Sequence, residues 1–394
     1  MKILLITYSL KGGAGKACHR LYEALKSVNS EIKILYLDGF LEVNPDIQPY
    51  FNSKSKFYIN QVSGQIHNKL ATIFYKKDRL LYKKPFLHTW LKYHVLFDWA
   101  DIINLHWLGN TLNWRVFFKK VKKPIVWTLH DMLPFSGGYH YSCETEHKIS
   151  NLAIETEKKK TRYLRYSKIA IVAPSQWLLE VSKNHLPFKG LEHTRIFNCI
   201  SSDFFKPIEK EISRSILGLP QDKKIILFSA DNIQSIRKGY NLLIDAIKSM
   251  RDLNIFLLSI GKGARQTGLD VPNKELGMLY DEYSLSLAYS CADIIVVPSI
   301  EDNSPNIILE SFACGRPVVG FNVGGIPELI NDLELGFIIE QIGSKELELG
   351  IRKALDKKYD AKYIRRNFQA RFHYEVAQRK YNDLFLTLCS KADK

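Results

Sequence analysis

The residues best placed for chemistry lie in one short stretch, residues 298–328 (PSIEDNSPNIILESFACGRPVVGFNVGGIPE). Asp302 stands in a polar loop after an apolar run at 293–297, which is typical of a buried strand. Glu310 comes later, inside residues 306–314, whose apolar side chains recur at helical spacing. Backbone N–H groups at the start of such a helix favour phosphate. A loop carboxylate, a helix carboxylate and a helix start together indicate a binding site for a phosphorylated ligand.

A second strand–loop–helix unit follows at once. Gly315 fits the end of the first helix, residues 317–321 are typical of a short strand, and a glycine loop opens onto a helix at Pro327. Parallel strands end at the same edge of a sheet, and open α/β sheets bind their ligands at that edge. Both helix starts are therefore expected at the ligand-binding edge of a parallel sheet.

Three motifs in this stretch resemble the retaining glycosyltransferases of family four, which are the group 1 glycosyl transferases with the GT-B fold. The family's acid–x7–Glu pair is matched by Asp302 and Glu310, although the family usually has Glu first. Its small-Cys-Gly-x-Pro-Val-Val run is matched by residues 313–319, and its Gly-Gly-x-Pro-Glu turn by residues 324–328. The resemblance implies an α/β fold of two doubly wound Rossmann-like domains facing across a cleft. It also implies transfer of a sugar from a nucleotide diphosphate sugar to an acceptor hydroxyl, with the anomeric configuration retained.

A cationic pair is expected at another helix start, in the C-terminal half. Residues 223–230 are typical of a strand, and Arg237-Lys238-Gly239 opens the helix that follows the next loop. Two cations at a helix start suit a diphosphate. The family's Arg–x5–Lys-Gly pattern is matched at Lys238 and Gly239, but Asn232 stands in place of its arginine. Either Arg237 supplies the second charge or this clamp is weaker.

The resemblance assigns roles to these residues. Lys238, Arg237 and helix N–H groups would stabilise the leaving diphosphate, and Glu310 would accept hydrogen bonds from ribose hydroxyls. Asp302 and His130 would bracket the sugar. No Asp-x-Asp occurs, so we expect no metal site, and no cofactor beyond the nucleotide-sugar substrate. The expected catalytic residues are His130, Asp302 and Lys238. The expected donor-binding residues are Gly12, Gly13, Arg237, Lys238, Asn303, Ser304, Pro305, Asn306, Ile307 and Glu310.

The N-terminal strand, residues 2–8, leads into a glycine-rich loop at 9–16 (SLKGGAGK) and a helix at 17–28. The run KGGAGK looks like a Walker A loop, but that motif needs Ser or Thr after its final lysine, and Ala stands there. It also resembles the Gly-Gly loop of the glycosyltransferases, where glycines let the backbone approach the donor. We favour this second interpretation; a deviant Walker-type ATPase and a sugar-nucleotide epimerase of the same fold are the alternatives.

Histidines follow two expected strands of the N-terminal half. His106 comes after a strand at 101–105, and His130 after a strand at 124–129. Residues 128–140 (TLHDMLPFSGGYH) resemble the exopolysaccharide and colanic-acid-type subgroup of the family, which implies that His130 faces the donor sugar. For His106 and His140 a structural and a functional role stay equally open.

The length of 394 residues indicates two domains. The resemblance implies an acceptor-binding domain at 1–200, a nucleotide-sugar-binding domain at 201–375 and a C-terminal helix at 376–394 that returns to the first domain. The sequence pattern predicts one long helix over 361–388. Residues 1–200 contain 30 Lys and Arg against 15 Asp and Glu, which is the whole net charge of +15. Residues 67–97 mix seven of these cations with aromatic and aliphatic side chains. This segment could lie on an anionic membrane or form a buried helix pair.

Composition narrows the setting and the partners. Six scattered cysteines without a CxxC pair indicate a reducing compartment, and no apolar run approaches the ~20 residues that span a bilayer. Without a signal peptide, we expect a cytoplasmic enzyme that is peripheral on the inner face of the cell membrane. The expected acceptor is a lipid-linked glycan of capsule, exopolysaccharide or O-antigen assembly, or a soluble glycan. No nucleic-acid recognition motif occurs.

Overall fold

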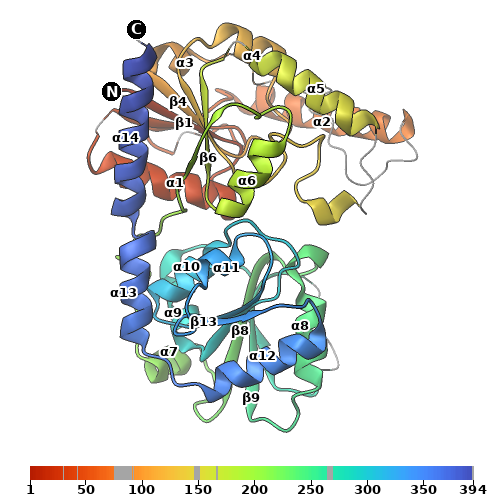
Figure 1. Cartoon of the computed structure of the whole chain (residues 1–394), viewed down its shortest axis with the longest axis vertical. Helices are drawn as coiled ribbons and strands as arrows, with labels where there is room; N and C mark the ends of the chain where they lie inside the picture. The colour runs from red at the N-terminus through yellow and green to blue at the C-terminus, as the bar shows by residue number, and fades with distance from the viewer. Residues whose placement is uncertain are drawn as a thin grey trace. The chain divides into compact units, whose positions relative to one another are not determined.

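The computed structural model describes the chain except at residues 30, 42, 75–90, 92, 146–150, 166, 264–268 and 393–394. The chain divides into two compact units (Figure 1). Unit 1 comprises Met1–Phe197 with Ala377–Lys394, and unit 2 comprises Asn198–Val376.

Unit 1 is built on a seven-stranded parallel sheet of order β3-β2-β1-β4-β5-β6-β7. Its central strands are buried throughout, as expected for a parallel sheet with helices on both faces. The strands that follow β1 lie on one side of the sheet, and those that follow its neighbour β4 lie on the other side. The loops leaving β1 and β4 therefore diverge and leave a ligand-binding position at the carboxyl edge. The strands are β1 (Ile3–Thr7), β2 (Ile32–Tyr36), β3 (Ile47–Pro49), β4 (Ile102–Leu105), β5 (Ile125–Thr128), β6 (Ile169–Ala173) and β7 (Glu192–Arg195).

Several helices of unit 1 begin at polar caps. Asn113 Oδ1 accepts a hydrogen bond from Val116 N at 3.1 Å, and Ser175 Oγ accepts one from Leu178 N at 3.0 Å. The helices are α1 (Gly12–Lys26), α2 (Lys54–Phe74), α3 (Val95–Trp99), α4 (Trp114–Lys120), η1 (Ser142–Thr145), α5 (Asn151–Leu164), α6 (Gln176–Asn184) and α14 (Tyr374–Ala392).

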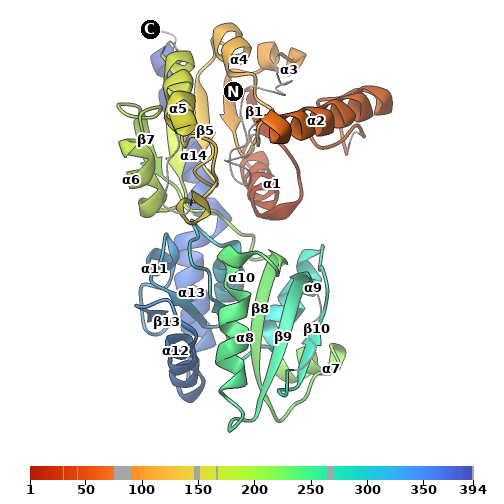
Figure 2. The ribbon, with the colours of Figure 1, turned by 90° about the vertical axis from the view of Figure 1, so that its right-hand side faces the viewer.

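Unit 2 is built on a six-stranded parallel sheet of order β10-β9-β8-β11-β12-β13. Here the order reverses between β8 and β11, and Figure 2 shows helices on both faces of the sheet. The strands are β8 (Lys224–Asn232), β9 (Ile255–Lys262), β10 (Asn273–Glu275), β11 (Ile294–Val297), β12 (Val318–Phe321) and β13 (Gly336–Ile339). The helices are α7 (Lys210–Ile216), η2 (Ile236–Lys238), α8 (Tyr240–Lys248), α9 (Glu282–Cys291), α10 (Asn306–Ala313), α11 (Ile326–Leu329), α12 (Ser344–Asp356) and α13 (Ala361–Phe372). The predicted pair of doubly wound α/β domains is confirmed.

The prediction of a single long helix over 361–388 is wrong. The chain forms α13 and α14, separated by His373, whose ψ of 146° is extended. Ile200 pairs with His373 as a β-bridge, and Ile200 N donates to Phe372 O at 3.2 Å. This tertiary pairing takes a carbonyl that a continuous helix would use, and helical spacing in the sequence carries no sign of it.

The helix expected at 17–28 begins earlier than predicted. α1 starts at Gly12, so most of the glycine-rich run is helical rather than a loop. A Cβ at Gly15 would lie 2.3 Å from the Ser9 carbonyl oxygen, so the glycine allows the helix to pass close to the end of β1. The packing requirement explains a glycine that the sequence alone assigns to a loop.

The basic segment expected at the membrane, residues 67–97, lies largely outside the described residues, which omit 75–90 and 92. Within the part of the chain that the structure describes, no helix is long and apolar enough to cross a bilayer.

Candidate active site

Two loops meet at the carboxyl edge of the unit 2 sheet, where the strand order reverses. One follows β8 and ends at Gly239, the N-cap of α8, whose φ is +67°. A Cβ at this position would lie 1.8 Å from the Pro298 carbonyl oxygen in the loop after β11. Only glycine fits both the backbone conformation and the space. The contact places Arg237 and Lys238 beside the loop that carries Asp302.

Asp302 forms ion pairs with both cations of the expected clamp. Its Oδ2 lies 2.6 Å from Lys238 Nζ and 3.3 Å from Arg237 Nη1. The residue is only 5% exposed, and Ser299 Oγ also approaches Oδ2, at 3.2 Å. Burial favours a higher pKa for this carboxyl, but the two cations and the hydrogen bonds outweigh it and hold the pKa of Asp302 below its usual range. Asp302 is therefore an ionised carboxylate that holds the two basic side chains in place.

The glycine turn at 324–328 supports the same loop. Gly324 has a φ of +55°, and a Cβ there would lie 1.8 Å from the Asp302 carbonyl oxygen. Gly325 N donates to that oxygen at 3.0 Å. The motif thus packs its backbone directly on Asp302, which explains why a glycine is needed at position 324.

The start of α10 faces the same loop. The N-cap residue, Pro305, offers no side-chain acceptor to the first turn. Asn198 Nδ2 donates to Asn306 Oδ1 at 3.0 Å, which ties the helix start to the beginning of unit 2. Asn303 and Ser304 are buried in the preceding loop. The backbone N–H groups of this helix start are suited to an anionic ligand.

Glu310 is buried on α10 and is bound by a residue that sequence reasoning missed. Tyr289, on α9, donates its hydroxyl to Glu310 Oε2 at 2.6 Å. Burial and the adjacent carboxylate raise the pKa of Tyr289 well above its ordinary value, so the hydroxyl remains a donor. Because Tyr289 has apolar neighbours on its helix, the sequence alone would assign it to the hydrophobic core.

The two strand-end histidines of unit 1 contact each other. His106 Nδ1 lies 3.0 Å from His130 Nε2, and His106 Nε2 lies 3.0 Å from Asn104 Oδ1. Burial lowers the pKa of His130 to about 4, although Asp131 raises it. Burial and His130 lower the pKa of His106 well below the ordinary value. Both imidazoles are therefore neutral at pH 7.

A second polar cluster of unit 1 contains His140. Asp131 Oδ2 accepts a hydrogen bond from Trp107 Nε1 at 2.8 Å and lies 2.6 Å from His140 Nδ1. The indole and imidazole rings of these two partners stack at a centroid distance of 5.9 Å. Leu133 N donates to Asp131 Oδ1 at 2.9 Å. Sequence reasoning left His140 open and did not single out Asp131 or Trp107, which follow the ends of adjacent strands.

The expected donor loop at Gly12 and Gly13 is instead the first turn of α1. Gly12 has a φ of +72° and begins the helix, and a Cβ at Gly13 would meet no atom within 4 Å. A Walker A site requires a loop whose backbone wraps the phosphates before the helix starts. The helical turn therefore speaks against the ATPase alternative. Among the described residues, no group of three or more His, Cys, Asp or Glu side chains is placed to hold a metal ion.

Residues 209–371, nearly all of unit 2, match the family model described as "Glycosyl transferases group 1". This segment is similar to the group 1 glycosyl transferases. The resemblance expected from the three sequence motifs is thereby confirmed.

Curated relatives match only part of the chain. A D-inositol 3-phosphate glycosyltransferase of Mycolicibacterium smegmatis is 29% identical over 156 residues, which is 36% of this chain and 35% of that protein. The protein of the same name from Mycobacteroides abscessus is 27% identical over 154 residues, 36% of this chain and 34% of that protein. The match thus spans about a third of the length of these relatives.

Solved structures resemble the whole chain in fold. Sucrose-phosphate synthase from Thermosynechococcus elongatus has a TM-score of 0.68 and 18% identity, with 99% of each chain covered. A glycosyltransferase from Rickettsia africae gives the same score and identity over 98% of each chain. Anabaena HepE in complex with UDP-glucose has a TM-score of 0.67 and 17% identity, covering 98% of this chain and 100% of that one. The expected GT-B fold is confirmed.

Proposed function

We propose that the protein is a retaining glycosyltransferase that moves a sugar from a nucleotide diphosphate sugar to an acceptor hydroxyl. The observation that supports this most strongly is the pairing of Lys238 and Arg237 with Asp302 beside the start of α10. It lies at the ligand-binding edge of a segment that is similar to the group 1 glycosyl transferases.

The proposed chemistry follows from the charge that develops on the leaving nucleoside diphosphate. Lys238, Arg237 and the N–H groups at the start of α10 stabilise that charge. Asp302 holds the cations in place before the donor binds and then lies beside the sugar. Glu310, oriented by Tyr289, accepts hydrogen bonds from the ribose hydroxyls. His130, neutral at pH 7, faces the reacting side of the sugar, and the leaving phosphate helps to deprotonate the acceptor.

We further propose that the reaction needs no divalent cation, because fixed cations take the place of a metal at the diphosphate. Turnover in excess EDTA is expected to equal turnover without it. Loss of activity in EDTA that Mn²⁺ or Mg²⁺ restores would contradict this part of the proposal.

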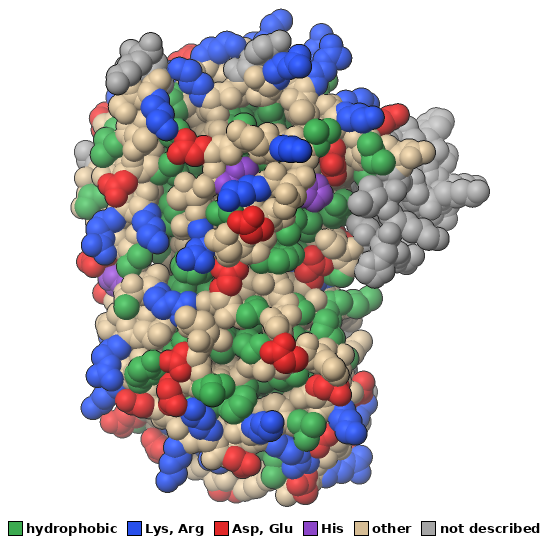
Figure 3. Space-filling model, in the orientation of Figure 1, with side chains coloured by type: hydrophobic (Ala, Val, Ile, Leu, Met, Phe, Trp, Pro, Cys, Tyr) green, Lys and Arg blue, Asp and Glu red, His purple; other side chains and the backbone are tan. Residues whose placement is uncertain are grey.

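The proposed acceptor is a lipid-linked glycan of capsule, exopolysaccharide or O-antigen assembly, reached at the inner face of the cell membrane. Two features support a membrane-bound acceptor. Lys and Arg side chains lie across the described part of the unit 1 face that Figure 3 shows, consistent with the +15 of residues 1–200. Helix α2, which projects from the rest of unit 1 in Figure 2, bears a row of apolar side chains that are each more than half exposed. The row consists of Tyr58, Ile59, Val62 and Ile66.

A panel of nucleotide sugars, read by thermal shift, tests the proposal. Any ligand that binds only the native state raises the unfolding temperature. Anabaena HepE is known in complex with UDP and with UDP-glucose, so UDP-glucose is the first donor to test. We expect at least one nucleotide sugar to raise the unfolding temperature of the wild type but not of Lys238→Ala. If the whole panel leaves the wild type unchanged, the proposed donor class is wrong.

A further inference from the structure

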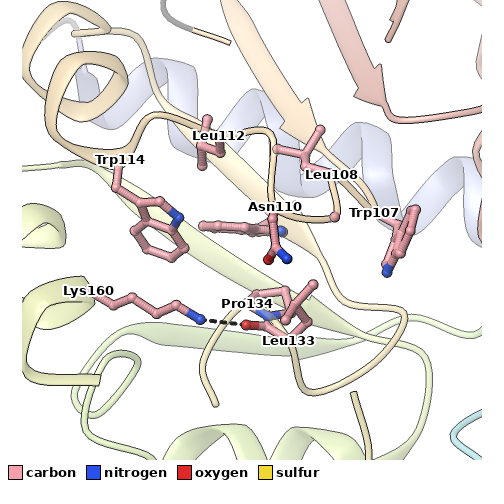
Figure 4. A pocket seen from close by; sticks show the side chains of 10 residues that line it. Trp107, Leu108, Asn110, Leu112, Trp114, Leu133, Pro134 and Lys160 are labelled. Atoms are coloured by element: carbon pink, nitrogen blue, oxygen red, sulfur yellow. Dashed lines mark hydrogen bonds between the residues drawn. The ribbon is translucent and has the colours of Figure 1, made fainter. Parts of the chain in front are cut away.

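Unit 1 contains a small cavity between the loops that follow β4 and β5, with a volume of about 20 Å³ (Figure 4). A single water molecule needs roughly 10–15 Å³ of cavity volume, so one oxygen-sized group fits and a sugar ring does not. The walls are mainly aromatic and aliphatic. The lining residues are Trp107, Leu108, Gly109, Asn110, Leu112, Trp114, Trp127, Leu133, Pro134 and Lys160.

Two polar atoms in this lining lack partners. Trp127 is 3% exposed, and its indole Nε1–H makes no hydrogen bond within the described parts of the chain. The buried Oδ1 of Asn110 likewise has no donor there. Buried polar groups in native proteins are nearly always satisfied, and an unsatisfied one lowers stability. Two residues that line the same cavity thus leave one donor and one acceptor unpaired among the described residues.

Lys160 forms the remaining polar wall. It is 1% exposed, and its Nζ donates to the carbonyl oxygens of Leu133 at 2.6 Å and Ser136 at 2.8 Å. Figure 4 shows the first of these bonds as a dashed line. Burial lowers the pKa of Lys160 to about 7, against the opposing charges of Glu157 and Asp131. The lysine fixes the loop after β5 and adds a second donor-bearing group to the wall.

We propose that this cavity binds one neutral hydroxyl oxygen, supplied either by a water molecule or by one hydroxyl group of the acceptor. A hydroxyl donates and accepts at once, so it satisfies Trp127 Nε1–H and Asn110 Oδ1 together. A cation would meet the N–H of Trp127 and the amine of Lys160. An anion would meet the lone pairs of Asn110 Oδ1. The pairing of donor and acceptor therefore selects a neutral amphoteric group.

If the bound oxygen belongs to the acceptor, the position of the cavity matters for the reaction. Only this alternative, in which an acceptor hydroxyl fills the cavity, rests on the proposed function. Trp107 lines the cavity, and its Nε1–H bonds to Asp131, which also contacts His140. A hydroxyl anchored here would hold the acceptor next to the polar cluster at the carboxyl edge of the unit 1 sheet. The water source requires no transferase activity.

Nuclear magnetic resonance of the full-length protein with ¹⁵N-labelled tryptophan tests the site. The chain has six tryptophans, so six indole signals are expected, and Trp→Phe substitutions at each position assign them. We expect a water cross-relaxation signal at Trp127 Nε1–H in buffer. Added glycerol serves as the hydroxyl probe. If glycerol shifts the Trp127 signal and removes the water signal, the cavity takes a ligand hydroxyl; if the water signal persists, it holds an internal water. No water signal and no glycerol shift would overturn the proposal.

Stability measurements give an independent test. If one oxygen bridges Trp127 and Asn110, then Trp127→Phe and Asn110→Ala each lower the unfolding temperature, and the double variant loses less than the sum of both. The control is Trp114→Phe, which also removes an indole from the cavity wall but no unpaired donor; its effect is expected to add to that of Asn110→Ala. Additive losses for Trp127 and Asn110, or a higher unfolding temperature in Trp127→Phe, would show that the cavity is empty.

Discussion

The carboxyl edges of the two sheets occupy equivalent positions in equivalent folds, yet their side chains differ in kind. In unit 2 the edge is ionic, with Lys238 and Arg237 paired to Asp302. In unit 1 the edge carries two neutral histidines, His106 and His130, whose charge is suppressed by burial. The architecture fixes where a ligand binds, and the loop side chains fix which chemistry it meets. The cationic pair of unit 2 suits a diphosphate, and the two neutral histidines of unit 1, beside the Asp131 carboxylate, suit hydroxyl groups.

The net charges of the two halves of the sequence show the opposite pattern to the side chains at their sheet edges. Residues 1–200 hold the whole excess of +15, while residues 201–394 hold 26 Lys and Arg against 26 Asp and Glu. The half without net charge therefore contains the cationic edge, and the strongly basic half contains the neutral one. Overall charge reports on a large surface such as a membrane, whereas a phosphate site depends on a few fixed groups.

The largest expected effect concerns the ionic edge. Lys238→Ala should lower turnover by about 100-fold or more, because a fixed charge that opposes the developing negative charge is lost. Steady-state kinetics with the donor found by thermal shift measures this. The control is Lys248→Ala, at an exposed position on α8 that pairs with the exposed Asp245. Near-wild-type turnover of Lys238→Ala would remove the basis for calling this edge the diphosphate site.

A smaller loss of activity is expected from changing a residue that contacts Glu310 rather than the donor itself. Tyr289→Phe removes the hydrogen bond to Glu310 without changing the ring, and should lower kcat/KM for the donor ~10-fold. We expect the change mainly in KM, because Glu310 is proposed to bind the ribose rather than the reacting atoms. Tyr283→Phe, at an exposed position on the same helix, is the matched control. An unchanged KM in Tyr289→Phe would assign the tyrosine to packing alone.

The basic half is tested by its affinity for membranes. Anionic vesicles should co-sediment with the protein at low salt, neutral vesicles should not, and high salt should release it, because Lys and Arg near the surface each contribute about 1 kcal/mol that salt screens. Replacing Ile59, Val62 and Ile66 of α2 by Ser should weaken binding several-fold. Ile216→Ser, an exposed apolar position in unit 2, is the control.

Further variants extend this test to the lysines that the sequence singles out in residues 67–97. Replacing Lys76, Lys77, Lys83 and Lys84 together by Ser should weaken vesicle binding and leave donor binding intact. These four positions lie outside the described residues. Wild-type protein that stays in solution with anionic vesicles at low salt would make a soluble acceptor the better proposal.

The smallest expected effect on turnover comes from titrating the neutral edge. Since the pKa of His130 is about 4 in the folded protein, against about 6.5 ordinarily, the side chain stays neutral and should add no pH dependence to turnover above pH 6.5. Stability behaves differently. Between about pH 6.5 and pH 4 the unfolded chain binds more protons, so the free energy of unfolding should fall as the pH falls. Denaturant titrations at several pH values should show a shallower fall in His130→Asn. An equal fall in both proteins would contradict a neutral His130.

The sequence could predict features that depend on residues close together in the chain, but not features that depend on contacts between residues far apart in it. The Asp302 and Glu310 spacing lies within one strand–loop–helix unit, so local periodicity placed both residues correctly on loop and helix. The pairing of Asp302 with Lys238 joins residues 64 positions apart and depends on how two loops pack. Tyr289 was missed for a similar reason: a buried tyrosine on an apolar helix differs from a core residue only through the partner that its hydroxyl meets.

Errors in the predicted elements have the same origin. Their glycine content assigns residues 9–16 to a loop, but α1 begins at Gly12, and its packing against Ser9 requires a glycine at position 15. The helix over 361–388 was continuous in pattern, but the bridge between Ile200 and His373 breaks it. In both cases a long-range contact overrides a local preference.

The break at His373 also sets the order in which the chain can fold during synthesis. Unit 1 is discontinuous, because it needs Ala377–Lys394, whereas unit 2 is a single continuous segment. Tyr381 OH lies 3.0 Å from Thr128 Oγ1, and Gln378 Nε2 donates to Ser27 Oγ at 2.6 Å, so the last helix completes a core whose strands were made first. Domains are usually finished in order from the N-terminus. Here all of unit 2 is synthesised before residues 377–394, which unit 1 needs, so a nonsense mutation just before residue 377 would damage unit 1.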